Sequence, residues 1–182
     1  IGHTFFGLPD LYDLDGTSYG VGNWSLMSYG SWNGPSIYIP WLGYSISGGG
    51  SPAWPDAWSR VRMGFETPLQ FQGNISNFLF QPVETLPSAG IGVVKLDSPN
   101  LGPQEYFLAE NRQRLGYDAY LPGDGLLIWH IDETRTSSNM ANATDQYNIN
   151  NRGKVRVAVD PAPDGWNTKV VQMIKDNNLL WD

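Results

Sequence analysis

The chain has 182 residues, a net charge of −7 at neutral pH and no cysteine. The acidic balance argues against nucleic acid or an anionic membrane as its main partner. Without cysteine, the chain contains neither disulfides nor thiolate metal ligands. Hydrophobic residues make up 41% and charged residues only 16%, while Gly (21) and Pro (13) are plentiful. This composition excludes a disordered chain and favours short strands with many turns over a helical bundle.

No apolar run reaches the roughly 18 residues that a membrane-spanning helix needs, so we expect no membrane insertion. The composition is rich in Trp, Tyr, Gly and Asn as well as acidic, which fits a secreted bacterial protein. The first residues of the chain resemble the second half of a longer metal-binding motif, which is described below. We therefore expect the signal peptide and the front of any catalytic domain to lie upstream of Ile1.

The opening segment predicts the end of a helix followed by a sharp turn. Residues 1–6 would form the last helical turns, with Gly7 as a left-handed stop and Pro9 preventing continuation. Asp10 follows directly after the helix end. If the turn is tight, the side chain of Asp10 points back towards His3.

Residues 13–34 are rich in Gly, Ser, Asn and Asp and are predicted to be a structured loop. Asp13 and Asp15 stand before Gly16, as carboxylates do in calcium loops, but the full EF-hand pattern is missing. An Asx-turn with solvated carboxylates is the equal alternative. Residues 35–50 run through aromatic side chains into a Gly-Gly-Gly sequence, which indicates a flexible loop.

A helix is predicted from Ser51 to Met63, with Pro52 near its first position. Its apolar face would consist of Trp54, Trp58 and Val61. Pro68 ends this unit, and the composition becomes strand-like after it. We therefore expect a boundary near residue 68, with residues 1–68 as one part and residues 69–182 as a β-rich module.

Four segments of the second part have strand patterns. Residues 93–96 are short and β-branched, and residues 105–111 follow a Gly-Pro turn. Residues 125–132 are almost all apolar, as expected of a central strand. Residues 154–160 alternate between valines and charged side chains, which is typical of a half-buried strand.

The opening segment also carries a candidate zinc site. In a helical HExxH sequence, the two His lie one turn apart and face one metal, while the Glu lies beside the metal-bound water. A third ligand comes from beyond the helix, and a glycine lets the chain turn sharply towards it. His3, Gly7 and Asp10 could supply the second His, the turn and an oxygen ligand.

The stretch from His3 to Asp13, with Gly-Leu-Pro-Asp-Leu-Tyr-Asp intact, resembles the metalloprotease family of immune inhibitor A, whose motif is HExxHxxGxxD. The similarity covers most of residues 1–133. Further similar blocks follow in the same order at residues 23–28, 30–34, 55–60, 64–65, 105–113 and 125–132. Several blocks in one order are more specific than any one of them.

Members of this family are secreted bacterial zinc endopeptidases, so the resemblance implies zinc as cofactor and a protein or peptide as substrate. It assigns zinc ligation to His3 and Asp10, and places Met27 in a turn beneath the metal, as in metzincins. By analogy with astacins and serralysins, Tyr29 would stabilise the oxyanion. Ordinary core packing of Met27 and a loop hydrogen bond of Tyr29 are the alternatives.

Two features depart from the family pattern. Gly7 follows His3 by four positions instead of three, and a bulge before the turn could absorb the extra residue. Otherwise the ligand role moves away from Asp10. The first His and the Glu of HExxH are absent from the chain, so we expect this fragment to be inactive and its parent protein to be the protease.

His130 is the only other histidine. It shares a strand face with Asp132, which suggests a His–Asp couple, although a buried His held by a neighbouring carboxylate is the favoured interpretation. Glu105 and Glu110 lie on opposite faces of one strand, so they do not form a glycosidase pair.

The expected architecture is α+β: the C-terminal part of a metzincin-like catalytic domain, made of loops and one helix, followed by the β-rich module. The rival hypothesis is a non-enzymatic, secreted β-rich binding or adhesion module that carries an inactive protease remnant. Its exposed, Trp-rich loops would then bind carbohydrate or a protein partner.

Overall fold

The computed structural model describes residues 1–12, 21–71, 80–85, 90–97, 101–133 and 157–159. These residues form both helices and sheets, which confirms the mixed α+β class. Three predicted strands are present almost as expected. They are β4 (Val94–Leu96), β5 (Glu105–Arg112) and β6 (Gly125–Asp132).

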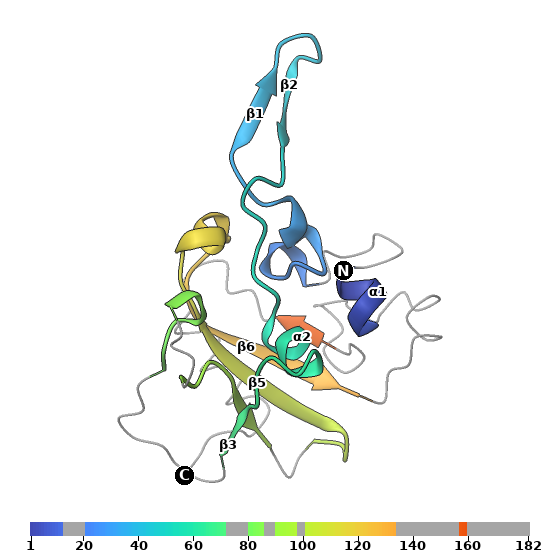
Figure 1. Ribbon diagram of the computed structural model, residues 1–182, viewed down its shortest axis with the longest axis vertical. Helices are drawn as coiled ribbons and strands as arrows, with labels where there is room; N and C mark the ends of the chain where they lie inside the picture. Colours follow the sequence, from blue (N-terminus) through green and yellow to red (C-terminus); the bar gives the residue numbers. More distant parts are fainter. Residues whose placement is uncertain (13–20, 72–79, 86–89, 98–100, 134–156, 160–182) are drawn as a thin grey trace.

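The main sheet has five strands in the order β3-β4-β5-β6-β7, with β3 at Leu69–Phe71 and β7 at Val157–Val159 (Figure 1). β3 pairs with β4 in parallel, and the other pairs are antiparallel. β5 and β6 pair along their whole length, from Glu105 opposite Asp132 to Arg112 opposite Gly125. Of the predicted strand at residues 154–160, Val157–Val159 lie in β7 and the rest lies outside the described residues.

Both faces of the sheet are buried. On one face, Leu108, Trp129 and Ile131 belong to a core cluster with side chains from the first 68 residues. On the other face, Val94, Phe107, Ala109 and Ile128 form a second cluster. Burial on both faces explains why β6 is nearly all apolar.

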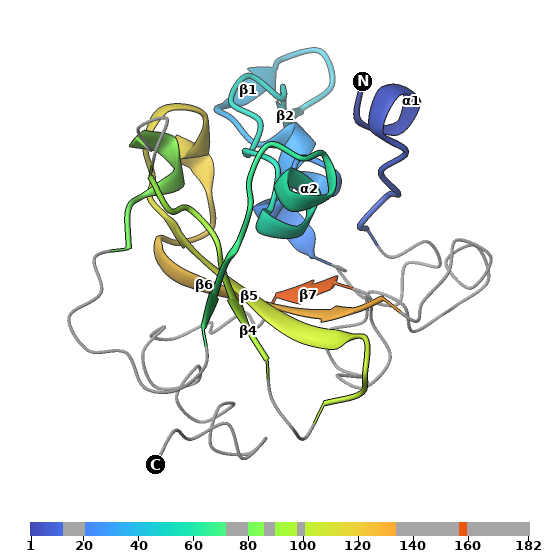
Figure 2. The same ribbon diagram turned by 60° about the horizontal axis from the view of Figure 1, so that its bottom comes forward.

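The predicted boundary near residue 68 falls between α2 (Ala57–Arg62) and β3, and the first core cluster continues across it. Leu11 and Trp58 pack in the same cluster as Leu108 and Trp129. Figure 2 shows α2 and the 3-10 segments η1 (Gly22–Trp24) and η2 (Tyr29–Trp32) above this face of the sheet. Of two more 3-10 segments, η3 (Val83–Thr85) precedes β4 and η4 (Gly116–Tyr120) connects β5 to β6.

The predicted helix at 51–63 is wrong in its first half, because α2 begins only at Ala57. Residues 51–56 are not helical, since their backbone groups pair with other segments. The N–H of Ser51 donates to Asn33 O, and that of Ala53 donates to Gly30 O. Pro55 also disfavours helical backbone at the preceding Trp54. α2 starts instead at an Asp56 N-cap, whose carboxylate accepts from the N–H of Ser59 at 2.9 Å.

Residues 35–50, predicted as a flexible loop, form an antiparallel hairpin of β1 (Ser36–Ile39) and β2 (Tyr44–Ser47). The hairpin projects from the body at one end of the long axis (Figure 1). Its register places Ile37 opposite Ile46 and Ile39 opposite Tyr44, so these four share one face. In the described part of the chain, no helix is long and apolar enough to cross a bilayer.

Candidate metal centre

α1 (Gly2–Phe6) presents His3, and the turn after it returns the chain to the same side. Gly7 has the predicted left-handed conformation (φ 61°), and its N–H donates to His3 O at 3.1 Å. The N–H of Leu8 reaches back to Gly2 O at 3.2 Å. This wide turn, closing over six positions, accommodates the extra residue between His3 and Gly7.

Asp10 does point back to His3, as the sequence predicts. His3 Nε2 lies 3.1 Å from Asp10 Oδ1. His3 Nδ1 lies 2.7 Å from Leu8 O, a carbonyl that can only accept, so Nδ1 carries a hydrogen. In the neutral imidazole, Nε2 then offers a lone pair to the space beside Asp10.

The two atoms are close enough to share either a proton or a cation. A lone pair and a carboxylate oxygen 3.1 Å apart repel each other unless a proton or a cation lies between them. Zinc binds imidazole nitrogen and carboxylate oxygen at about 2.0–2.2 Å, which places two tetrahedral ligands roughly 3.3 Å apart. The hydrogen bond from Nδ1 to a backbone carbonyl is also the usual support of a metal-ligating histidine.

Tyr12 supports Asp10 from the other side, a role that the sequence analysis did not assign to it. Its hydroxyl donates to Asp10 Oδ2 at 3.1 Å, which leaves Oδ1 directed at His3. The charge of the Asp10 carboxylate, followed by this hydrogen bond, raises the pKa of Tyr12. The signal in the sequence was a tyrosine two positions after Asp10, because its hydroxyl is a hydrogen-bond donor close to the carboxylate.

Met27 lies against α1, and its predicted place beneath a metal stays a prediction. A Cβ on Gly2 would come within 2.8 Å of Met27 Sδ, so the two residues are in close contact. The Met27 carbonyl accepts from the N–H of Leu11 at 2.8 Å, and its own N–H donates to Ser25 Oγ at 3.0 Å. The Met27 turn is thus hydrogen-bonded to the segment that carries Asp10.

His3 and Asp10 open onto a cleft of about 670 Å³. Tyr29 lines it and is 39% exposed, and its ring lies 6.2 Å from that of Tyr12. Ser28 also lines it, and the Ser28 Oγ is buried with no hydrogen-bond partner among the described residues. The complete lining consists of Ile1, Gly2, His3, Asp10, Tyr12, Leu26, Met27, Ser28, Tyr29, Ser31 and Trp32.

The remaining candidates do not join this cleft. Asp13 and Asp15 lie outside the described residues, so the calcium site stays a prediction. His130 lies opposite Phe107 in the sheet and stacks on its ring at 5.0 Å, on the face away from α2. Its Nε2 lies 3.8 Å from a carboxylate oxygen of Glu105, whereas the side chain of Asp132 lies outside the described part of the structure. Within the described segments, no three His, Cys, Asp or Glu side chains could share a metal, so His3 and Asp10 stand as a pair.

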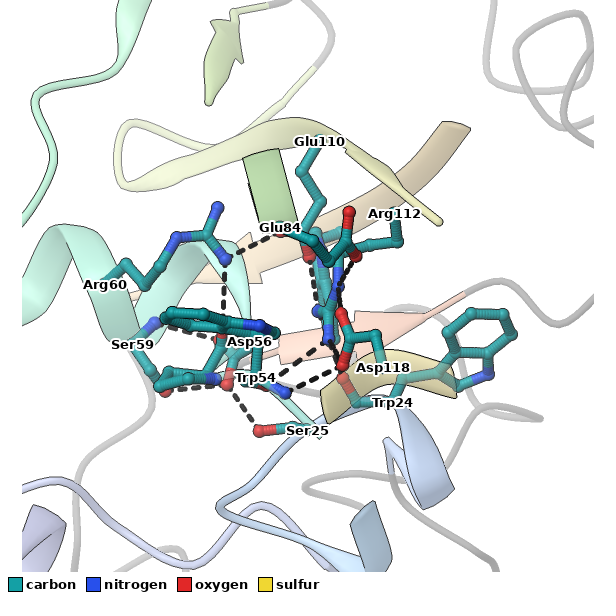
Figure 3. A network of polar contacts seen from close by, with 12 residues as sticks. Trp24, Ser25, Trp54, Asp56, Ser59, Arg60, Glu84, Glu110, Arg112 and Asp118 are labelled. Carbon is teal, nitrogen blue, oxygen red and sulfur yellow. Dashed lines mark hydrogen bonds and ion pairs between the residues drawn. The ribbon is translucent and has the colours of Figure 1, made fainter. Parts of the chain in front are cut away.

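A buried charge network, also missed by the sequence analysis, joins the cleft-bearing segments to the sheet (Figure 3). Arg112 is fully buried and donates to Glu110, at 3.2 Å, and to both oxygens of Asp118, at 2.7 and 2.8 Å. It also donates to the carbonyls of Trp24 and Trp54. Burial lowers the pKa of Arg112, but Glu110 and Asp118 outweigh it and raise the value.

A second arginine extends the network towards α2. Arg60 Nη1 donates to Glu110 at 2.8 Å, and Arg60 Nε donates to Glu66 at 2.6 Å. Burial lowers the pKa of Arg60, and the charges of Glu110 and Glu66 raise it overall. Asp56, fully buried at the start of α2, accepts from Ser25 Oγ at 2.5 Å. The start of α2 is therefore bonded to Ser25, before Met27, and Arg60 bonds the helix to β5 of the sheet.

Glu84 makes this network sensitive to pH. Burial, followed by a hydrogen bond with Asp118, raises the pKa of Glu84 from 4.5 to about 7, although the N–H of Gln113 acts in the opposite direction. Its side chain is 2% exposed. The folded state therefore holds the Glu84 proton more tightly than the unfolded chain does. The resulting stabilisation is complete below about pH 4.5 and is lost as the pH rises through 7.

We expect Glu84→Gln to flatten this pH dependence, because an amide keeps both the donor towards Asp118 and the acceptor for Gln113. Between pH 5 and 8, the wild type should lose on the order of 2 kcal/mol of unfolding free energy relative to the variant. Urea unfolding at several pH values measures the difference. Parallel curves for the two proteins would contradict the raised pKa.

Comparison of the chain with protein-family models, curated protein sequences and solved structures gives no match. The fold and the cleft by themselves define a mixed α+β protein in which His3 and Asp10 form a pair.

Proposed function

We propose that this chain is the C-terminal part of a secreted zinc endopeptidase of the immune inhibitor A type, acting on protein or peptide substrates. The observation that carries the proposal is the 3.1 Å approach of His3 Nε2 to Asp10 Oδ1, above Met27. The motif predicts that these two side chains meet, and they do so although this chain has one more residue between His3 and Gly7 than the motif. A histidine, a carboxylate and an underlying methionine turn in one cleft agree with the resemblance.

In this proposal, His3 and Asp10 hold the zinc together with the missing first His of the HExxH motif. Bound zinc lowers the pKa of a water molecule and polarises the scissile carbonyl. Leu8 O fixes the tautomer of His3, and Tyr12 orients Asp10. Tyr29 lines the same cleft, where its hydroxyl can donate to a developing oxyanion. In the same proposal, the general-base Glu belongs to the upstream half of the motif.

The test is casein hydrolysis by the full-length parent protein. We expect activity that a chelator abolishes and that added zinc restores. Sequencing upstream of Ile1 should show His-Glu at the positions of the HExxH motif. A parent without these residues, or one whose hydrolysis survives removal of zinc, contradicts the proposal.

Tyr12→Phe should weaken zinc binding by the parent about 10- to 100-fold, as is typical when a residue that orients a ligand is lost. The variant keeps the ring but not the hydroxyl that holds Asp10 Oδ2. Competition with a chromophoric chelator measures the zinc affinity. Tyr29→Phe is the matched control, since Asp10 keeps its hydrogen bond from Tyr12. Equal zinc affinities of the two variants would remove Tyr12 from this role.

The β1–β2 hairpin favours the second candidate, a binding or adhesion module. Trp41 at its tip is 83% exposed, and Tyr38 and Tyr44 are 61% and 55% exposed. Tyr44 lies on the face of Ile37 and Tyr38 on the opposite face, so apolar side chains are exposed on both faces of the hairpin. Extended exposed apolar surface marks interaction sites. If the parent binds a polysaccharide in affinity electrophoresis, and Trp41→Ala but not Tyr120→Ala abolishes the retardation, this function is supported. Equal retardation of both variants would contradict it.

A further inference from the structure

Beside the His3–Asp10 cleft lies a second, smaller hollow of about 210 Å³. The two hollows share Leu26, which lines both. The remaining lining of the smaller one, which we call the Trp54 pocket, consists of Pro52, Ala53, Trp54, Pro55 and Tyr117. No side chain in this lining carries a charge.

The walls of the Trp54 pocket are fixed by hydrogen bonds to the rest of the fold. The N–H of Trp54 donates to Asp118 Oδ1 at 2.8 Å, and Asp118 is in turn held by Arg112. Ser51 Oγ donates to the Tyr117 carbonyl at 2.8 Å. The rings of Trp54 and Tyr117 meet edge to face at 6.5 Å. The buried network thus supports a preformed apolar pocket, as recognition sites require.

The volume of the Trp54 pocket limits the kind of group that it can bind. Sites for whole small molecules usually measure about 300–1,000 Å³, so this hollow is too small for a cofactor. Its volume suits one bulky apolar side chain. A charged side chain would lose its hydration here without gaining a partner. Because the pocket adjoins the cleft through Leu26, a polypeptide in the cleft can place a neighbouring side chain there.

We propose that the Trp54 pocket is a specificity subsite that takes a leucine- or phenylalanine-sized apolar side chain of the polypeptide substrate. This inference rests on the proposed peptidase function for its substrate. The pocket itself is testable without hydrolysis, because its lining among the described residues lies within the 182-residue chain.

The first experiment titrates the 182-residue chain with N-acetylleucinamide, N-acetylalaninamide and N-acetylglutamic acid amide. The indole N–H resonance of Trp54 in the NMR spectrum, assigned with Trp54→Phe, reports binding. We expect saturable shifts with the leucine probe, and binding of the other two weaker on the order of tenfold or more. Tyr117→Ser should abolish the preference. Tyr120→Ser is the matched control, since both tyrosines are exposed in η4 and Tyr120 does not line the pocket.

The second experiment measures kcat/KM of the full-length parent on peptides that carry leucine, alanine or glutamate at each position around the cleaved bond. One position should show a leucine preference that Tyr117→Ser, but not Tyr120→Ser, reduces about tenfold. Absence of leucine binding, or binding without any effect of Tyr117→Ser on substrate preference, overturns the subsite. A parent that binds the leucine probe but hydrolyses nothing contradicts the peptidase function and, with it, the assignment to a substrate.

Discussion

His3→Ala should reduce kcat/KM of the full-length parent by on the order of 10³-fold or more, the scale seen when a group central to catalysis is removed. His3 is the one imidazole in the cleft, and its Nε2 faces Asp10 with Nδ1 held by Leu8 O. Alanine removes the imidazole nitrogen that would bind the proposed zinc and leaves Asp10 without its partner. Zinc content after dialysis, measured with the rate, should fall in parallel. The variant should stay folded, because His3 is exposed.

The chain offers a matched control in its second histidine. His130 lies on β6 with Phe107 and Glu105 around it, on the face of the sheet away from α2. His130→Gln should therefore keep the hydrolysis rate within a few-fold of the wild type. If His3→Ala retains zinc and activity, His3 is not a ligand. If His130→Gln loses activity while its melting temperature is unchanged, the assignment of the site to the His3 cleft is wrong.

The local part of this site could be predicted from the sequence. Gly7 and Pro9 encode the end of α1 and the turn, which bring His3 and Asp10 together over seven positions. The contact of Met27 with Gly2 is long-range and was not predicted, since the family resemblance placed Met27 only in a turn beneath the metal. The role of Tyr12 was missed because its aromatic ring reads equally well as packing. Tyr12 binds one carboxylate oxygen of Asp10 and leaves the other facing His3, which the sequence does not show.

β5 and β6 could also be predicted locally, because their own residues show the patterns that are typical of strands. The β1–β2 hairpin was missed because its turn lacks the Asn-Gly or Asp-Gly signal and is Pro40-Trp41-Leu42-Gly43 instead. The segment 51–56 was predicted helical from Pro52 and the spacing of Trp54 and Trp58, yet tertiary hydrogen bonds decide its conformation. The buried charge network was the hardest part to predict. Arginines usually lie on the surface, and the sequence does not show that the fold places carboxylates beside Arg60 and Arg112.

Arg112→Met should destabilise the chain by about 3–5 kcal/mol, the usual result of breaking a buried ion network by removing one partner. Methionine fills much of the volume, but Asp118 loses its guanidinium partner and Glu110 keeps only that of Arg60, while both carboxylates stay fully shielded from solvent. The midpoint of urea unfolding should fall at constant m-value. Arg114→Met is the control: Arg114 lies two positions on, is exposed and donates to Pro122 O, so its loss should change stability by less than about 0.5 kcal/mol.

The same substitution should also reach the cleft. Arg112 donates to the carbonyl of Trp24, which precedes the Ser25–Met27 turn, and to that of Trp54 in the apolar pocket. Hydrogen exchange of the Met27 and Trp54 amides should therefore accelerate in Arg112→Met under conditions where the protein is still folded. Acceleration confined to β5 would mean that the network stabilises the sheet alone. Acceleration at both amides would show that one buried arginine holds the His3 cleft and the Trp54 pocket in place together.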